Sequence, residues 1–535
     1  DACDAATGRL RSLAGEVDAT QAPLIAIDTE LTALADDLGK ARGALLDALD
    51  EAKLVPATVS EDGTEVTYTG PALDKERTKV VQSRMMEVLD AIDDAVQRAH
   101  KADQAAAKRL AKLVPGYDPK TQGNGYVPEG DLPAPGTDPK KVNAWWDGLS
   151  PAEQQYLIHR HPDRIGRLDG VPVMYRDQAN RVRLARERDK AEARRRKVRA
   201  RLEELETIMR DGDSSAATRA AREAARLMRE REVLDKNLRG IKAIEGRLYD
   251  APTKPRAYLI GFEPGTVEDR GHDGVDDSDG RAIIAIGNPD TADHVATFVP
   301  GTGNDLGNVN GQVEYADKMA LDAGRAAPDE DTAVIMWLGY DAPDDPFVNS
   351  PAEHYAEAAT DDLRRFQDGL RATHEGAPSH NTVIGHSYGA TVIGYAASGD
   401  VNHDGRPDGV NADELVFVGS PGVGVDRAYE LGGVSPDHVW ATRAEHDIIR
   451  RVPDVWFGTD PSDQDFGGHP FDSGPGNPDD ETGTHSRYWE DEKARDGMAG
   501  IITGNYDRVP GYTPTTPPDG PTPAPSPRPA PTAPR

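Results

Sequence analysis

Between residues 257 and 443, short apolar runs alternate with longer segments of helical patterning, and this alternation limits the fold more than any other feature. Apolar runs of this length are typical of buried strands, and helices between consecutive strands make those strands parallel. We therefore expect an α/β domain over 256–507, a mostly parallel sheet with helices on both faces. The expected strands are 257–262, 282–287, 294–299, 332–338, 382–385, 414–419 and 438–443.

A strand, a tight turn and a helix follow one another over 381–399, and the turn has the sequence GHSYG at 385–389. This is the pattern of a nucleophile elbow, in which a strained serine between a buried strand and a helix projects its hydroxyl above the sheet. Glycines flank the turn because side chains there would collide with the neighbouring strand or helix. Ser387 is therefore the candidate nucleophile.

A serine nucleophile on such a sheet needs a carboxylate and a histidine, which follow it in the order Ser, Asp/Glu, His. Asp447 comes just after the expected strand 438–443, at the sheet end where sites of open α/β sheets are assembled. Asp447 is the candidate acid, and Glu445 and Asp465 are the alternatives.

The candidate base is His485, which lies late in the domain, just before its final helical stretch. His469, in a glycine-rich loop, is the less favoured choice. An oxyanion hole needs backbone N–H groups, and the glycine-rich turn 300–304 follows an expected strand. We expect the N–H groups of Thr302 and Tyr388 to form it.

Several of these segments together resemble a family of bacterial α/β-hydrolases long known only as a domain of unknown function. The resemblance lies in 287–303, the GHSYG elbow, the GSPG turn at 419–422 and the HSRY sequence at 485–488. Residues 166–180 resemble the segment that often precedes that domain. Covering 145–490, the resemblance implies a Ser-Asp-His hydrolase of unassigned natural substrate, with an attached helical region.

One segment, 400–408, departs from that family pattern and has the opening of a calcium-binding loop, with a glycine for the sharp turn. The twelfth position of the loop is Asn411 rather than an acid. A structural calcium ion and an acidic surface turn both remain open, and no other cofactor is expected. The candidate calcium ligands are Asp400, Asn402, Asp404 and Asp408.

Residues 1–112 carry apolar residues at helical spacing and are expected to form a helical bundle or coiled coil, with a small hairpin over 60–71. Such helices could serve a helical partner or self-association. The Pro- and Gly-rich stretch 113–140 is expected to be a linker, and 508–535 a disordered proline-rich tail.

Residues 141–255 are expected to be helical, with an antiparallel helical hairpin over 181–249 that breaks at 211–215. Its first arm holds 11 Lys or Arg against 3 acids between 181 and 201. This basic block fits either contact with an anionic surface or a solvated face that pairs with acidic residues of the protein itself.

Composition restricts the partners and the compartment. The net charge of −31 argues against nucleic acid, and no apolar run approaches the roughly 18 residues of a membrane span. Cys3 is the only cysteine, which excludes an internal disulfide. The residue usage suggests a bacterial source, and the tail and helices favour export or the cell envelope, with the cytoplasm as the alternative. The start lacks both Met and a secretory signal, as expected if the natural N-terminus lies upstream.

These features predict a serine hydrolase that acts on a carboxylic ester or related acyl bond of a small-molecule or lipid-like substrate. The alternative, from another class, is a secretion- or envelope-associated helical binding protein with a degenerate hydrolase domain. An intact serine, acid and histidine in the required order disfavour this alternative.

Overall fold

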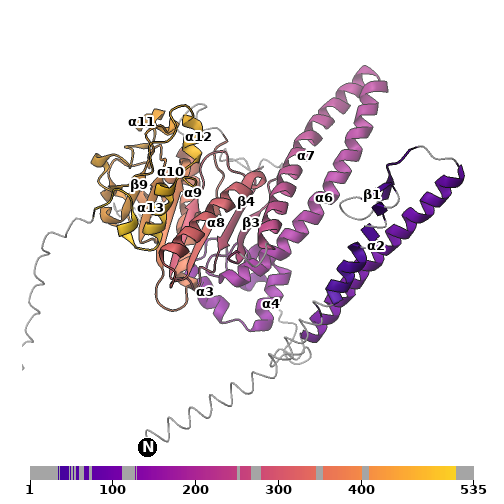
Figure 1. Cartoon of the computed structure of the whole chain (residues 1–535), viewed down its shortest axis with the longest axis horizontal. Helices are drawn as coiled ribbons and strands as arrows, with labels where there is room; N and C mark the ends of the chain where they lie inside the picture. The colour runs from indigo at the N-terminus through magenta and orange to yellow at the C-terminus, as the bar shows by residue number, and fades with distance from the viewer. Residues whose placement is uncertain are drawn as a thin grey trace, which may run out of the picture. The chain divides into compact units, whose positions relative to one another are not determined.

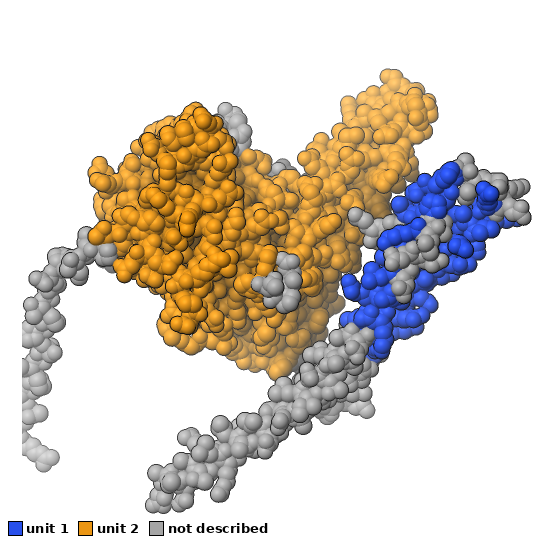
Figure 2. Space-filling model, in the orientation of Figure 1, with its two compact units in different colours: residues 1–126 blue, residues 127–535 orange. Residues whose placement is uncertain are grey.

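The protein, seen here in a computed structural model, forms two compact units, residues 1–126 and 127–535 (Figure 2). The boundary between the units falls inside the expected linker. The division into five segments made from the sequence stays a prediction. The structure describes residues 34, 37–46, 48–49, 52–53, 56–59, 66–71, 75–110, 127, 129–249, 254–266, 279–344, 353–399 and 409–513.

The first unit is built on the long helix α2 (Lys75–Leu110). Val88 and Ile92 of α2 pack against Ala48, in the helical stretch before it. The strands β1 (Ala57–Val59) and β2 (Val66–Tyr68) pair in the antiparallel direction, as expected for a hairpin in this region. The two helical patterns read from the sequence therefore share one small apolar cluster.

The second unit is organised around an eight-stranded sheet with the order β10-β9-β8-β7-β5-β6-β4-β3. Only β4 runs against the common direction of the other strands, so the expected mostly parallel sheet is confirmed. Every expected strand is present, and the short edge strand β10 adds to them. The bounds are β3 Ala257–Glu263, β4 Arg281–Ile286, β5 His294–Val299, β6 Thr332–Leu338, β7 His380–His386, β8 Glu414–Val418, β9 Val439–Thr442 and β10 His469–Pro470.

Helices cover the sheet and connect its parallel strands, since α8, α9 and α10 each lie between two consecutive strands from β5 to β8. α8 packs on α13, and α9 packs on α10. The strands β5 and β8 are buried along their whole length, as expected for central strands with helices on both faces. The bounds are α8 Val309–Ala326, α9 Glu353–Thr373, α10 Tyr388–Ser398, α11 Asp454–Phe457, α12 Glu481–Ser486 and α13 Glu492–Ile502.

Residues 139–248 form five helices, of which α6 and α7 pair as the expected hairpin and extend away from the sheet (Figure 1). Arginines of the basic block pair with acids of α7 across this hairpin, as Arg188 does with Glu245 and Arg201 with Glu223. These arginines therefore fit the second interpretation of the basic block, a face that pairs with acidic residues of the protein itself. The bounds are α3 Pro139–Asp147, α4 Pro151–Arg160, α5 Pro162–Ile165, α6 Val173–Asp211 and α7 Ser214–Leu248.

The first turns of α6 cover the outer edge of the edge strand β3. The buried Asp177 carboxylate accepts the Leu259 N–H at 2.8 Å, and the Asn180 side chain donates to the Leu259 carbonyl at 3.0 Å. Arg181 donates to the Ala257 carbonyl at 3.2 Å. An uncovered edge would expose unpaired backbone groups that can pair with another chain. These side chains satisfy them and join the helical segment to the sheet in one unit.

Two stretches differ from their sequence-based expectation. In the expected linker, Val127 and Leu132 are buried in an apolar cluster with Trp146. In the expected tail, Tyr512 packs edge-on against Trp440 at 4.8 Å between ring centroids. Both stretches hold large apolar side chains among prolines and glycines, and the packing of these side chains extends the fold to residues 127 and 513. Residues 514–535 lie outside the described part of the chain.

A buried carboxylate, Glu414 at the start of β8, joins the strands β7, β8 and β9 to the residues that follow α13. It accepts hydrogen bonds from Trp440 at 2.6 Å and from Tyr506. It also contacts the His438 ring at 2.7 Å and the His380 ring at 3.3 Å. Burial alone would raise the pKa of Glu414, but these hydrogen bonds outweigh it and lower the pKa.

Replacing Glu414 by glutamine is expected to lower the free energy of unfolding by about 2–4 kcal/mol, because an amide cannot accept from all of these donors. The control is Glu357→Gln, on the exposed face of α9. Urea unfolding of both variants measures the difference. Equal stability of Glu414→Gln and wild type would contradict the assigned role.

The stability difference between wild type and Glu414→Gln should also depend on pH. Because the pKa of Glu414 is lowered in the folded protein, this carboxylate stabilises the fold at pH values above its pKa in the unfolded chain, about 4.3. This stabilisation is lost as pH falls through the pKa of the folded protein. Burial lowers the pKa of His380, but the bond to Glu414 outweighs this and raises it. The stabilisation from His380 is therefore fully present below about pH 6.5, the pKa of histidine in the unfolded chain, and is lost as pH rises through the pKa of His380 in the folded protein. The difference should be largest between these two values.

Candidate active site

Ser387 lies in the bend between β7 and α10 with a backbone φ of 55° and ψ of −129°. It is the one non-glycine residue with positive φ within the described ranges, and such a conformation costs about 1–3 kcal/mol. Glycine is required on both sides of it. A Cβ on Gly385 would lie 2.6 Å from the Ala390 backbone, and one on Gly389 would lie 2.2 Å from the Val299 carbonyl oxygen. The turn therefore has the geometry expected of a nucleophile elbow.

The structure brings Ser387, His485 and Asp447 together in one chain of hydrogen bonds. The Ser387 Oγ lies 2.8 Å from Nε2 of His485, which is on α12. The other ring nitrogen, Nδ1, lies 2.8 Å and 3.0 Å from the two carboxylate oxygens of Asp447. Ser387 is 8% exposed and the Asp447 side chain is fully buried, so solvent reaches the serine end and not the acid end.

Asp447 is held as a carboxylate by several donors. Besides His485, the Tyr488 hydroxyl donates to it at 2.6 Å and the Ile449 N–H at 2.8 Å. Burial would raise the pKa of Asp447, but these hydrogen bonds and the nearby imidazole lower it overall. Gly419 leaves room for this arrangement, because a Cβ there would lie 3.1 Å from the Asp447 carboxylate. The GSPG and HSRY segments thus meet at the acid.

Two aromatic neighbours position the site and were not assigned a role from the sequence. The Tyr488 hydroxyl accepts the Ala444 N–H at 3.0 Å while donating to Asp447, which fixes the loop that carries the acid. The ring of His386 lies 4.9 Å from that of His485, and its Nε2 donates to the His485 carbonyl at 2.7 Å. Burial, then the neighbouring His485, lowers the pKa of His386 to about 3, so this ring is neutral.

The turn after β5 lies directly against the elbow. A Cβ on Gly301 would be 2.7 Å from the Ser387 Cβ and 3.1 Å from the Tyr388 nitrogen. Asn304 donates to the carbonyls of Gly301 at 2.7 Å and Thr302 at 3.3 Å. These oxygens are therefore already bonded to a donor, and among the described residues the Thr302 N–H donates to no acceptor.

The alternative acids and the alternative base lie outside this arrangement. Glu445 is exposed, and the structure joins Asp465 to Arg427 through its backbone carbonyl. His469, on β10, packs against Trp440 and lies 3.8 Å from the Asp437 carboxylate. The candidate calcium ligands at 400–408 lie outside the described residues. Within the described part of the chain, no cluster of His, Cys, Asp or Glu could hold a metal ion.

Comparison with known proteins places the domain in a family. The sequence model of the α/β-hydrolase family matches residues 276–456. The uncharacterized protein Rv2079 of Mycobacterium tuberculosis is 30% identical over 415 residues, 71% of this chain and 57% of that protein. The uncharacterized protein Mb0988c of Mycobacterium bovis is 30% identical over 198 residues, 35% of this chain and 70% of that protein.

The sheet order, the helical connections and these matches define an α/β-hydrolase domain. The chain belongs to the bacterial α/β-hydrolase family that its sequence resembles. It spans little more than half, 57%, of the length of Rv2079.

Two solved structures are also similar to parts of the chain. One is the esterase PE8, with 17% identity, covering 31% of this chain and 74% of that one at a TM-score of 0.22. The other is a thermostable esterase from Pseudomonas putida, with 12% identity, covering 51% of this chain and 90% of that one at a TM-score of 0.25. Scores this low carry no argument about substrate or mechanism.

Proposed function

We propose that the protein is a serine hydrolase that cleaves carboxylic esters or related acyl bonds with Ser387, His485 and Asp447. The observation that carries this proposal is the hydrogen-bond chain from the Ser387 hydroxyl through both nitrogens of His485 to the buried Asp447. This chain of hydrogen bonds begins at a serine with a strained backbone. Such strain costs stability, and a residue with a purely structural role would have no use for it.

Each residue has a defined step in this reaction. His485 Nε2 takes the proton of Ser387 Oγ as the oxygen attacks the substrate carbonyl carbon, and then returns that proton to the leaving alcohol. Water, deprotonated by the same nitrogen, then attacks the acyl carbon. The bond from that carbon to Ser387 Oγ breaks, the acid leaves, and Nε2 returns the proton to Oγ. Asp447 holds the proton on Nδ1, so that Nε2 is the basic nitrogen, and stabilises the imidazolium as it forms.

The developing oxyanion would be held by the N–H groups of Thr302 and Tyr388. Support comes from the close approach of the 300–304 turn to the elbow. The N-terminus of α10, which begins at Tyr388, adds a partial positive charge beside the same point. The proposed substrate is a small-molecule or lipid-like ester.

A chain-length series of p-nitrophenyl esters, with a lipid and a peptide panel beside it, tests this function and its substrate class. Turnover of at least one ester, absent in Ser387→Ala, is the expected result. If no ester or lipid is cleaved and only peptides are, the acyl-ester assignment is wrong. If nothing in either panel is cleaved, the hydrolase proposal fails and the binding-protein hypothesis gains support.

The two hydrogen bonds from Asn304 to the 300–304 turn give a further prediction. Asn304→Ala should lower kcat by about tenfold and leave KM nearly unchanged, because the Thr302 N–H loses its fixed direction while ground-state binding does not change. The matched control is Asn310→Ala on α8, whose side chain donates to Glu314 on the same helix. A change in KM alone would mean that Asn304 shapes the substrate pocket instead.

A further inference from the structure

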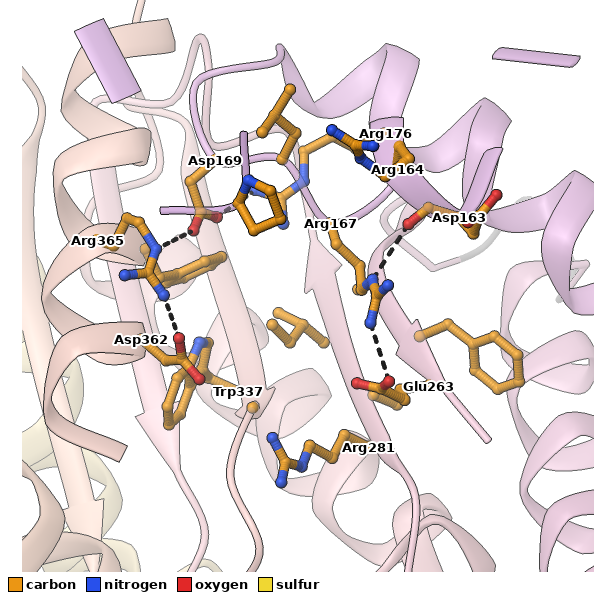
Figure 3. Close-up of a pocket in the computed structure, with 18 of the residues that line it drawn as sticks. Asp163, Arg164, Arg167, Asp169, Arg176, Glu263, Arg281, Trp337, Asp362 and Arg365 are labelled. Atoms are coloured by element: carbon orange, nitrogen blue, oxygen red, sulfur yellow. Dashed lines mark hydrogen bonds and ion pairs between the residues drawn. The ribbon is translucent and has the colours of Figure 1, made fainter. Parts of the chain in front are cut away.

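A cavity of about 420 Å³ lies between the helical segment and the sheet, and none of the three proposed catalytic residues lines it (Figure 3). Its volume is in the range of small-molecule sites, which often form where two parts of a chain meet. The walls come from α5, α6 and α9, and the floor from the ends of β3 and β6 and the start of β4.

Strand register shows which residues form the floor. Gly261, Ile283 and Trp337 stand opposite one another on β3, β4 and β6, and all three line the cavity. Residues opposite one another share one face of a sheet. Gly261 contributes no side chain, and neither does Gly339, where a Cβ would lie 2.6 Å from the Trp337 ring. Both positions require glycine, because the Ile283 and Trp337 side chains already lie where a Cβ would stand.

The charges around the cavity do not balance internally. Arg365 pairs with Asp362, and Arg167 with Glu263 at 2.9 Å (Figure 3). Arg281 has no hydrogen-bond or ion-pair partner among the described residues, and Figure 3 draws it with none. The lining includes the arginines 164, 167, 176, 281 and 365 and the acids Asp163, Asp169, Glu263 and Asp362.

A second group in the wall also lacks a partner. The indole of Trp337 is 1% exposed, and its N–H is buried without a hydrogen bond. Because this N–H is closed to solvent, the indole serves as part of the apolar wall. Apolar surface from Ile283 and Phe366 lies beside it. Within the described residues, the cavity therefore offers a cation without a hydrogen-bond or ion-pair partner, Arg281, and an apolar wall.

We infer that this cavity binds a small amphiphilic anion, a carboxylate or phosphate group joined to an apolar body. Arg281 holds the anionic group, and the apolar body lies against Ile283 and Phe366. Asp163 and Glu263 restrict the site to a single anionic group, because both add negative charge to the rim. This binding site is separate from the proposed catalytic serine.

Calorimetric titration of the full chain with octanoate and with octyl phosphate tests this inference, and 1-octanol is the uncharged comparison. The protein carries Ser387→Ala, so that the result does not depend on turnover. We expect one site per chain for at least one anion, at least about tenfold tighter than 1-octanol. The stronger of the two anions identifies whether the head group is a carboxylate or a phosphate.

Variants separate this site from the catalytic one. Arg281→Gln should weaken binding of the anion by about tenfold, and Arg281→Lys should weaken it less. The matched control is Arg199→Gln, an exposed arginine of α6 that pairs with Glu203. The inference is overturned if neither anion binds, if 1-octanol binds equally well, or if Arg281→Gln binds as tightly as wild type.

Discussion

Ser387→Ala is expected to lower kcat for ester hydrolysis by about 10⁶-fold, the loss seen when the nucleophile of a triad is removed. Alanine can occupy the same strained turn at the same cost, so the fold should be unchanged. The measurement is steady-state hydrolysis of the preferred p-nitrophenyl ester, with urea unfolding as the check on folding.

Thr391 of α10 serves as the hydroxyl control for that experiment, because it lies close to the nucleophile in the chain but outside the hydrogen-bond chain of the site. Its side chain is buried and donates to the Gly422 carbonyl at 2.9 Å. Thr391→Val should cost stability and leave kcat within about tenfold of wild type. If Ser387→Ala retains most of the activity, another residue is the nucleophile.

Asp447→Asn is expected to lower kcat by about 10⁴-fold with a smaller effect on the fold. An asparagine can turn its amide toward Nδ1 of His485, which favours the tautomer that cannot accept the serine proton. The amide oxygen would still accept from one of the two other donors, the Tyr488 hydroxyl or the Ile449 N–H, which limits the cost to the fold. The pH dependence and kcat of the purified variant are measured beside those of wild type.

Glu445→Gln and Asp465→Asn are the matched controls for this variant, since both change an acid that lies outside the hydrogen-bond chain. Each should stay within about tenfold of wild type. Near-normal activity of Asp447→Asn together with loss in either control would mean that the acid is misassigned, although the hydrolase proposal would survive.

The strands of the α/β domain could be predicted from the sequence because each is a short run of apolar side chains. The direction of β4 could not, since a run such as 282–287 is equally apolar in either direction. Only the pairing with β3 and β6 shows that β4 is antiparallel. Likewise, the packing of Val127 and Tyr512 depends on distant partners that no local pattern displays.

The residues of the candidate site could be named from motifs and chain order, but their surroundings could not. His386 precedes the serine in the elbow, yet only the fold places its ring against His485, 99 residues later in the chain. The same holds for Asp177, whose bond to Leu259 spans 82 residues. The HSRY sequence drew attention to Tyr488, but only the structure shows the hydrogen bond to Asp447 that gives this tyrosine a role.

Covalent labelling with a fluorophosphonate, followed by mass spectrometry of the modified peptide, tests the central proposal most directly. The probe needs a serine that its histidine has activated, and it needs no knowledge of the natural substrate. We expect one adduct, on Ser387, which Ser387→Ala lacks and His485→Ala forms far more slowly. No adduct under conditions that label a known esterase, or equal labelling of Ser387→Ala, would contradict the proposal.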